Sequence, residues 1–316
     1  MEWLNSFSDK EQAAIIAAII SAVVSIITVF IKGVIDWIRE DRHLRYKLKK
    51  EYTFNQRMHI KESLAKSKTP LIKAAEELNY RLWDFSVNID KGWHSMNNDQ
   101  QIRDRGWGYY LKSFVYRLLS FFYWIDKAEK DIYDFDFSVA DESDQVYVKY
   151  VKTLENFFCE KLLIKEMIAD NPDDSRHHFY KNQLNIFVSY VQDNGNLLSF
   201  DQFINKLESG FTKISRVISY IKEIKNDKND PKYNIIMSFH LFLMLFLNKY
   251  GLDYQFTDRN KFHDIVKNKY YDKIVIKNEL LEFFEQNKIQ KEVKWIIEDL
   301  GLETKRKCSI FANSNK

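Results

Sequence analysis

A run of twenty consecutive positions near the start of the chain carries no charge and consists mostly of apolar residues. Residues 12–31 read QAAIIAAIISAVVSIITVFI. An α-helix rises about 1.5 Å per residue, so this run makes about 30 Å of helix, which matches the hydrocarbon thickness of a bilayer. A helix also satisfies its own backbone N–H and C=O groups, as a bilayer requires. The pattern therefore predicts a single transmembrane helix over residues 12–31.

Apolar residues after this run recur every three or four positions, which is the period of an amphipathic helix. Three stripes of this kind are Leu71, Ala74, Ala75, Leu78, Leu82 and Phe85; Tyr110, Phe114, Leu118, Phe121 and Ile125; and Val151, Leu154, Phe158, Leu162 and Met167. Residues 235–247 are apolar nearly all round but too few to span a bilayer, so they predict a buried central helix. Residues 274–276 alone hint at a strand. We therefore expect an all-α protein, in which an aromatic-rich helical bundle follows the transmembrane helix.

Residues that cap or break helices indicate where these helices begin and end. Two positions fit an N-cap followed by proline at the first helical position, namely Thr69 with Pro70 and Asp230 with Pro231. Ser199 with Gln202 resembles a capping box, and Gly251 and Gly301 fit the position after a helix C-terminus. Residues 171–175, NPDDS, predict a break before a helix over residues 177–191.

These signals divide the chain into six parts. We expect a short extracytoplasmic N-terminus (1–11), a transmembrane helix (12–31), a basic juxtamembrane helix (32–57), two helical subdomains (58–171 and 172–303) and a flexible tail (304–316). The chain has only three prolines and eight glycines, which favours helices, and 16% of its residues are aromatic, which supports a sizeable core.

Basic residues are distributed unequally about the apolar run. Lys10 alone precedes it, whereas seven follow within nineteen positions: Lys32, Arg39, Arg42, Arg45, Lys47, Lys49 and Lys50. Because Lys and Arg resist translocation, we expect the N-terminus outside the plasma membrane and the C-terminal body in the cytoplasm. A cleaved signal peptide would need a basic start and a small-residue cleavage site, and the sequence has neither.

Motifs that carry catalytic chemistry are absent from the sequence. It contains no phosphate-binding loop, no G-x-S-x-G, no H-E-x-x-H and no C-x-x-C. Cys159 and Cys308 are not spaced as a metal or redox pair, and His177 with His178 and His263 with Asp264 are more consistent with solvated helix positions than with metal ligands. We expect no cofactor and no metal; the missing motifs favour a protein that is not an enzyme, and a catalytic site assembled from distant residues stays open as the alternative. The formal net charge of +3 does not indicate nucleic-acid binding.

Three polar residues lie within apolar or aromatic runs. They are Arg81, Arg117 and His240. A buried guanidinium needs a carboxylate, a carbonyl or an aromatic ring as a partner, and a buried imidazole needs a hydrogen bond. We expect structural polar pairs at these positions, with a phosphate-binding role for the arginines as the alternative.

Two short patterns in or beside the apolar run predict what it contacts. Six basic residues after the run either enforce topology alone or also contact anionic lipid headgroups: Arg39, Arg42, Arg45, Lys47, Lys49 and Lys50. Ala14, Ala18 and Ala22 are spaced by four, so they would let two spans approach closely. The expected partners are the lipid bilayer and either a second copy or another protein.

Two aromatic segments carry a resemblance. TPLIKAAEELNYRLWDF at residues 69–85 and FVYRLLSFFYW at residues 114–124 are similar to uncharacterised bacterial proteins with one N-terminal span and a helical cytoplasmic body. The resemblance implies a bacterial inner-membrane setting and no particular activity.

These observations favour a membrane-tethered helical scaffold or signalling protein that recruits a partner and self-associates. One alternative is a membrane effector of a bacterial stress or phage-defence system, whose assembled spans compromise the bilayer. Another is a membrane-bound hydrolase with an unrecognised site.

Overall fold

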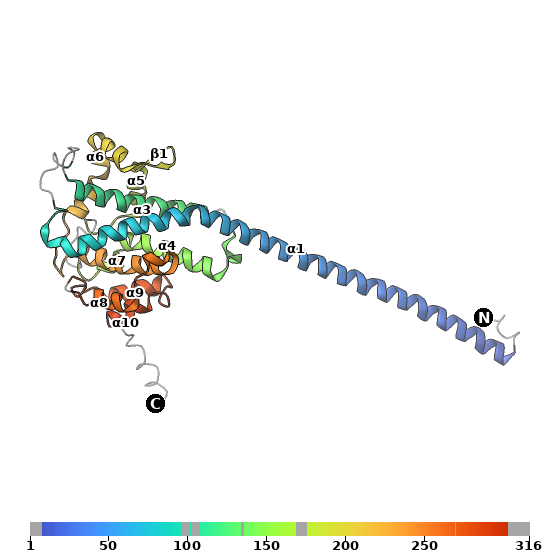
Figure 1. Cartoon of the computed structure of the whole chain (residues 1–316). Helices are drawn as coiled ribbons and strands as arrows, with labels where there is room; N and C mark the ends of the chain where they lie inside the picture. The colour runs from blue at the N-terminus through green and yellow to red at the C-terminus, as the bar shows by residue number, and fades with distance from the viewer. Residues whose placement is uncertain are drawn as a thin grey trace, which may run out of the picture. The chain divides into compact units, whose positions relative to one another are not determined.

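The computed structural model describes residues 8–95, 102, 108–133, 136–168, 176–268 and 270–302. With η for a 3₁₀-helix, its elements are α1 (Asp9–Asn88), η2 (Ile89–Lys91), α3 (Tyr109–Tyr133), η3 (Phe137–Val139), α4 (Glu142–Cys159), η4 (Lys161–Ile164), α5 (Lys181–Tyr190), β1 (Gln192–Asp193), β2 (Asn196–Leu197), α6 (Phe200–Lys222), α7 (Pro231–Tyr250), η6 (Asp253–Gln255), α8 (Arg259–Val266), α9 (Lys277–Gln286) and α10 (Lys294–Asp299) (Figure 1). The structure is about 78% helical, which confirms the all-α prediction.

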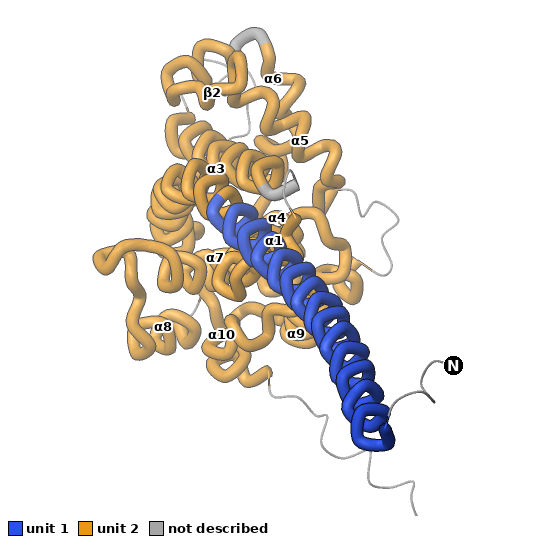
Figure 2. Tube along the Cα trace, turned by 90° about the vertical axis from the view of Figure 1, so that its right-hand side faces the viewer, with its two compact units in different colours: residues 1–58 blue, residues 59–316 orange. Residues whose placement is uncertain are grey.

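The chain divides into two compact units, residues 1–58 and 59–316 (Figure 2). The described part of the first unit is α1 up to residue 58, and none of its residues is buried. The second unit has one hydrophobic core, to which α1 contributes from Ile60 onward. The predicted break at residues 171–175, the subdomain division there and the predicted tail at 304–316 lie outside the described residues.

The second unit is built around α7, as the apolar pattern predicted. Asp230 caps this helix by accepting a hydrogen bond from the Lys232 N–H at 2.9 Å, and Pro231 is its first residue. Every residue from Pro231 to Leu247 is buried. The Phe239 ring lies 5.0 Å from that of Phe158, centroid to centroid, in an edge-on arrangement that aromatic rings favour. The predicted buried central helix is therefore confirmed.

The remaining helices cover α7 and one another. α4 packs against α7, and α3 packs against α4, α5 and α6. The α3 stripe residues Phe114, Leu118 and Phe121 are buried, as their spacing predicted. The third stripe is only partly helical, because α4 ends at Cys159. A two-residue hairpin joins α5 to α6, with β1 antiparallel to β2.

The largest departure from the predicted boundaries is at Pro70. Thr69 with Pro70 was expected to start a helix, but α1 continues through Pro70 as one helix of 80 residues. A proline inside a helix removes a backbone hydrogen bond and costs about 3 kcal/mol. Buried residues on both sides, including Leu64 before it and Leu71 after it, belong to the same core. Tertiary packing therefore overrides the local stop signal.

One helix start was also predicted too early, and the hint of a strand is not realised. The helix expected over residues 177–191 begins only at Lys181, because the Phe179 N–H donates to the Phe158 carbonyl at 2.7 Å and so is not part of a helical turn. Residues 274–276 form no strand, since the Val275 N–H donates to Asn234 Oδ1 at 2.8 Å. The capping box of Ser199 with Gln202 is present, and Gly301 has the left-handed φ of +65° expected after a helix.

Candidate functional site

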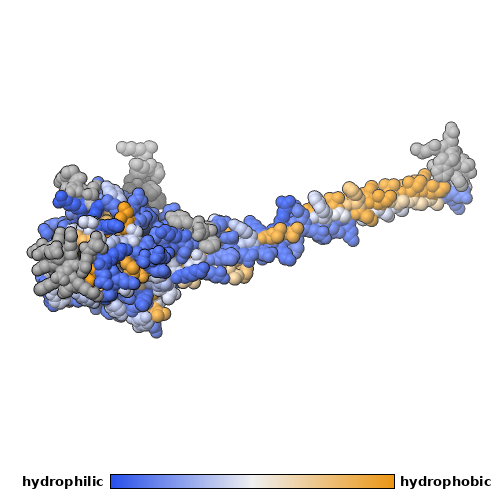
Figure 3. Space-filling model, turned by 90° about the horizontal axis from the view of Figure 1, so that it is seen from above, coloured by the Kyte–Doolittle hydropathy of each residue, from blue (hydrophilic) through white to orange (hydrophobic). Residues whose placement is uncertain are grey.

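The apolar run of α1 lies on the surface. The side chains of Ile26, Val29 and Phe30 leave 70%, 73% and 72% of their area exposed. Figure 3 shows the apolar run as a continuous hydrophobic surface near the start of the helix. Within the described residues, α1 is the one helix long and apolar enough to cross a membrane, and its most apolar window has no buried residue.

α7 provides the comparison with an apolar helix that serves as a core. Its apolar side chains are buried by the helices around it, whereas those of residues 12–31 are not. Burying one Val, Ile or Phe side chain is worth about 1.5 to 3 kcal/mol. The α1 run therefore carries a large apolar surface that a surrounding apolar medium would stabilise.

Two polar side chains inside the run, Ser25 and Thr28, donate hydrogen bonds to the helix backbone. Ser25 Oγ donates to the Ser21 carbonyl at 2.8 Å, and Thr28 Oγ1 donates to the Val24 carbonyl at 2.8 Å. Both bonds reach back one helical turn, as serine and threonine do in apolar surroundings. Neither hydroxyl therefore opposes transfer of the run into hydrocarbon as an unpaired donor would.

The three predicted span-packing residues lie along α1 as expected from their spacing. Ala14, Ala18 and Ala22 are helical and exposed. Consecutive members are four residues apart, or about 40° round the helix. They form a shallow line of small side chains among larger ones.

The predicted lipid-contacting residues follow the run on the same helix. Arg39, Arg42, Arg45, Lys47, Lys49 and Lys50 are all exposed. Arg45 Nε lies 2.8 Å from Asp41 Oδ2, an exposed pair one turn apart that contributes little stability. Lys50 Nζ lies 4.7 Å from the centroid of the Tyr46 ring, within the range of a cation–π contact.

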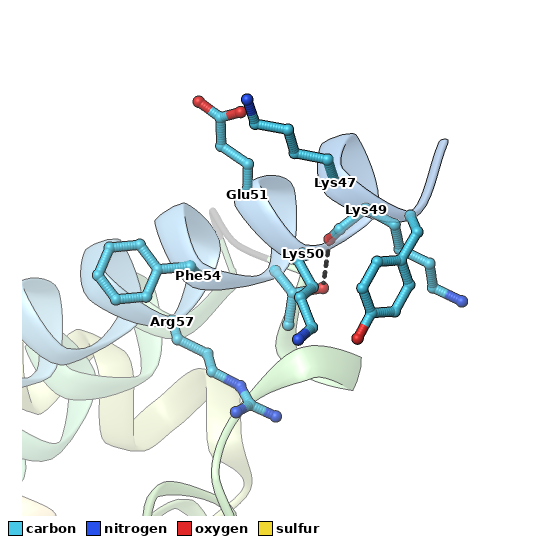
Figure 4. Close-up of a pocket in the computed structure, with 8 residues that line it drawn as sticks. Lys47, Lys49, Lys50, Glu51, Phe54 and Arg57 are labelled. Atoms are coloured by element: carbon cyan, nitrogen blue, oxygen red, sulfur yellow. Dashed lines mark hydrogen bonds between the residues drawn. The ribbon is translucent and has the colours of Figure 1, made fainter. Parts of the chain in front are cut away.

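An open hollow of about 910 Å³ lies along this segment, lined by Tyr46, Lys47, Lys49, Lys50, Glu51, Thr53, Phe54 and Arg57. Figure 4 shows Lys50 and Arg57 projecting from one side of α1. Four of the lining residues are basic, namely Lys47, Lys49, Lys50 and Arg57, and two are aromatic, namely Tyr46 and Phe54. The surface of the hollow is therefore both cationic and apolar. The sequence prediction named the lysines but not Tyr46, Phe54 or Arg57.

Arg81 is buried and held by three groups. Its Nη2 donates to Ser113 Oγ at 3.0 Å, its Nη1 lies 3.5 Å from Asp84 Oδ2, and its guanidinium stacks 4.2 Å from the Tyr110 ring centroid. Arg117 is half-buried and donates through Nη1 to the Glu77 carbonyl at 3.1 Å. Burial, followed by the nearby Arg81 charge, lowers the pKa of Arg117. These contacts join α1 to α3.

His240 is fully buried in α7 and linked on both ring nitrogens. Its Nε2 lies 3.0 Å from Asn79 Oδ1 and its Nδ1 lies 2.5 Å from the Tyr271 hydroxyl. Burial lowers the pKa of His240 to about 3, so the ring is neutral. The amide oxygen can only accept, so Nε2 carries the proton and Nδ1 accepts from Tyr271. His240 thus connects α1, α7 and the turn before α9.

A buried acidic pair was not predicted. Lys181 Nζ, at the start of α5, lies 2.8 Å from Glu129 Oε2 of α3 and 2.7 Å from Glu155 Oε2 of α4. Burial, and then the Glu129 charge, raise the pKa of Glu155 to about 7. A signal did exist, since Glu155 lies between Val151 and Phe158 on a buried stripe, but the three residues are far apart in sequence.

The histidines weighed as metal ligands have other surroundings. His263 Nδ1 lies 3.2 Å from Asp299 Oδ1, which Arg259 also contacts at 2.9 Å, so the pair belongs to an ionic link between α8 and α10. His177 and His178 precede α5 rather than lying within a helix. In the described parts of the chain, no group of three or more His, Cys, Asp or Glu residues is arranged to hold a metal ion.

Comparisons with protein families, with curated proteins and with solved structures each found no match to this chain. The function is therefore inferred from the chain's own surfaces. Two of them stand out in the first unit: the apolar run and the basic segment that follows it.

Proposed function

We propose that the protein is a membrane-tethered helical interaction protein of a bacterial inner (plasma) membrane. In this proposal residues 12–31 cross the membrane once, and the helical body recruits another protein on the cytoplasmic side. The observation that carries the proposal is the exposed apolar run with its self-satisfied Ser25 and Thr28. The excess of Lys and Arg after the run supports the orientation.

The segment after the run supports a binding role. Residues 32–58 are helical with no buried side chain. A lone helix in water gains little from its own propensity, and most helices are stabilised by packing. An exposed helix with basic and aromatic side chains is therefore suited to binding a partner.

Self-association is part of the same proposal. Spans in lipid are not driven together by the hydrophobic effect, so close packing at small residues holds them. Ala14, Ala18 and Ala22 offer such a line in the run.

Extraction from membranes at alkaline pH tests the anchor. Integral proteins stay in the pellet, whereas peripheral and soluble ones are released. We expect wild type to stay in the pellet and a variant with Ile20→Lys and Val24→Lys to be released, because each central lysine costs about 2.5 to 3.5 kcal/mol of insertion.

Leu44→Lys with Leu48→Lys is the matched control. Leu44 and Ile20 are equally exposed on α1, at 55% and 56%, but Leu44 lies outside the run. The control variant should stay in the pellet. Release of wild type would contradict the anchor, and equal release of both variants would show that charge on α1, and not the run, governs extraction.

A further inference from the structure

A second face of α1 lies beyond the apolar run. At about 100° per residue, positions spaced by three and four share one side of a helix. Six exposed residues follow this spacing: Arg39, His43, Tyr46, Lys50, Phe54 and Arg57. We refer to them as the cation–aromatic face. It combines three Lys or Arg side chains with the rings of His43, Tyr46 and Phe54 over about 27 Å of helix.

The chemistry of this face is cationic and apolar at once. Tyr46 and Phe54 leave 58% and 62% of their area exposed, and the Lys50 ammonium lies over the Tyr46 ring. Residues 39–57, which include this face, contain seven Lys or Arg side chains and three acidic ones, Glu40, Asp41 and Glu51. The hollow beside Lys50, Phe54 and Arg57 gives a partner a place to seat (Figure 4).

Lipid headgroups do not reach most of this face if residues 12–31 span the bilayer. α1 is unbroken, so Lys50 lies about 28 Å beyond Ile31 along the helix, and about 22 Å above it even at a 40° tilt. The headgroup layer is about 6 Å thick and the Debye length is about 8 Å. Lipid contact therefore remains a prediction for Arg39 and Arg42, while Lys47, Lys49 and Lys50 lie beyond the reach of the headgroups and are open to another partner.

Two other occupants fit less well. A second copy would place like charges of the same face against each other, which is unfavourable. Nucleic acid is held mainly through its phosphates, and the chain's formal net charge of +3 does not indicate such binding. Exposed Tyr46 and Phe54 also call for apolar surface in the partner. A protein that offers carboxylates next to apolar side chains complements both properties.

We propose that the cation–aromatic face of α1 binds an acidic protein, through a helix or groove that sets Asp or Glu beside apolar side chains. The inference rests on the proposed function and deepens it, because it gives the recruited partner a chemistry and a place on the chain.

The test uses the full chain in phosphatidylcholine nanodiscs and a fluorescein-labelled peptide with three repeats of Glu-Leu-Ala-Glu-Leu-Glu-Ala. Fluorescence anisotropy should show binding that weakens as salt is raised. Lys50→Glu should weaken binding by about tenfold, since it reverses a charge at the centre of the face. Arg45→Glu makes the same charge change about 140° round the helix, so it should alter binding by less than about twofold.

Phe54→Ala separates an acidic protein from a simple polyanion. This substitution should weaken binding of the leucine-containing peptide but leave binding of a poly-glutamate peptide of the same length unchanged. A short DNA duplex that binds as tightly as the peptide and is insensitive to Phe54→Ala would overturn the proposal in favour of nucleic acid. Loss of peptide binding when phosphatidylserine is added to the nanodiscs would overturn it in favour of lipid.

Absence of peptide binding to wild type would also overturn the proposal. The membrane anchor is measured separately by alkaline extraction. A chain that fails to enter nanodiscs yet binds the peptide in solution would contradict the anchor and leave the binding face standing.

Discussion

His240 and Glu155 are the two buried residues whose protonation should shape the stability of the bundle. The pKa of His240 is lowered from 6.5 to about 3, and that of Glu155 is raised from 4.5 to about 7. The lowered pKa of His240 favours the folded state at higher pH, whereas the raised pKa of Glu155 favours the folded state at lower pH. Between about pH 4.5 and 6.5 the two effects oppose each other, so wild type alone will not reveal either.

His240→Gln should remove an acid sensitivity. Below pH 6.5 the unfolded chain binds a proton at His240 that the folded chain refuses, so its contribution to stability is lost by about 1.4 kcal/mol per pH unit as pH falls toward 3. Denaturant unfolding of the full chain in detergent between pH 4 and 7 measures this slope. Glutamine does not titrate, so the stability of the variant relative to wild type should increase as pH falls below 6.5; parallel curves would mean that the ring is accessible to protons in the fold.

Glu155→Gln should show the reverse dependence. The folded chain keeps a proton on Glu155 that the unfolded chain has released between about pH 4.5 and 7, so stability falls as pH rises through this window and the loss is complete above it. Glutamine removes the buried charge while Glu129 still pairs with Lys181. Thermal melts at pH 8 should show the variant more stable by about 2 kcal/mol, with a smaller difference at pH 5. A less stable variant at pH 8 would show that Glu155 is ionised and needed by Lys181.

At the scale of elements, α1 has two environments along one helix. Its first 50 described positions have no buried residue, whereas Ile60 to Ser86 lie in the core at helical spacing. The sequence allowed the buried part to be predicted, because the stripe from Leu71 to Phe85 has a local period. It did not show that the helix continues through Pro70, because that depends on packing with segments remote in sequence.

Leu78→Ala tests the core-facing side of α1. Leu78 is fully buried, so its truncation should cost about 2 to 5 kcal/mol of unfolding free energy. Val87→Ala is the matched control on the same helix, since Val87 is 54% exposed and should cost less than about 0.5 kcal/mol. Equal effects in denaturant titrations would show that the buried face has been assigned wrongly.

Ala18→Ile tests the span-packing face. Isoleucine keeps the run apolar but prevents close approach of two helices, so cross-linking in membranes should show fewer oligomers than in wild type. Ala17→Ile adds the same side chain about 100° away and should leave the oligomers unchanged. Oligomers of equal abundance in wild type and Ala18→Ile would exclude the alanine face as the interface.

At the scale of the whole molecule, the sequence allowed more of the fold than of the sites to be predicted. The apolar run and the α7 core helix follow from local composition alone. The Lys181 link between Glu129 and Glu155 does not, because three helices must pack before the charges meet. The cation–aromatic face is readable in the sequence, but only once residues 39–57 are known to form an unbroken, exposed helix.

A single crossing of the membrane with the body inside is the central claim, and reporter fusions after Lys316 test it most directly. A fluorescent protein that matures only in the cytoplasm should be active there, and alkaline phosphatase, which is active only outside, should not be. This outcome is predicted from the seven basic residues that follow the run within nineteen positions against Lys10 before it. Active phosphatase with a dark fluorescent fusion would contradict the orientation and place the binding face of α1 outside the cell.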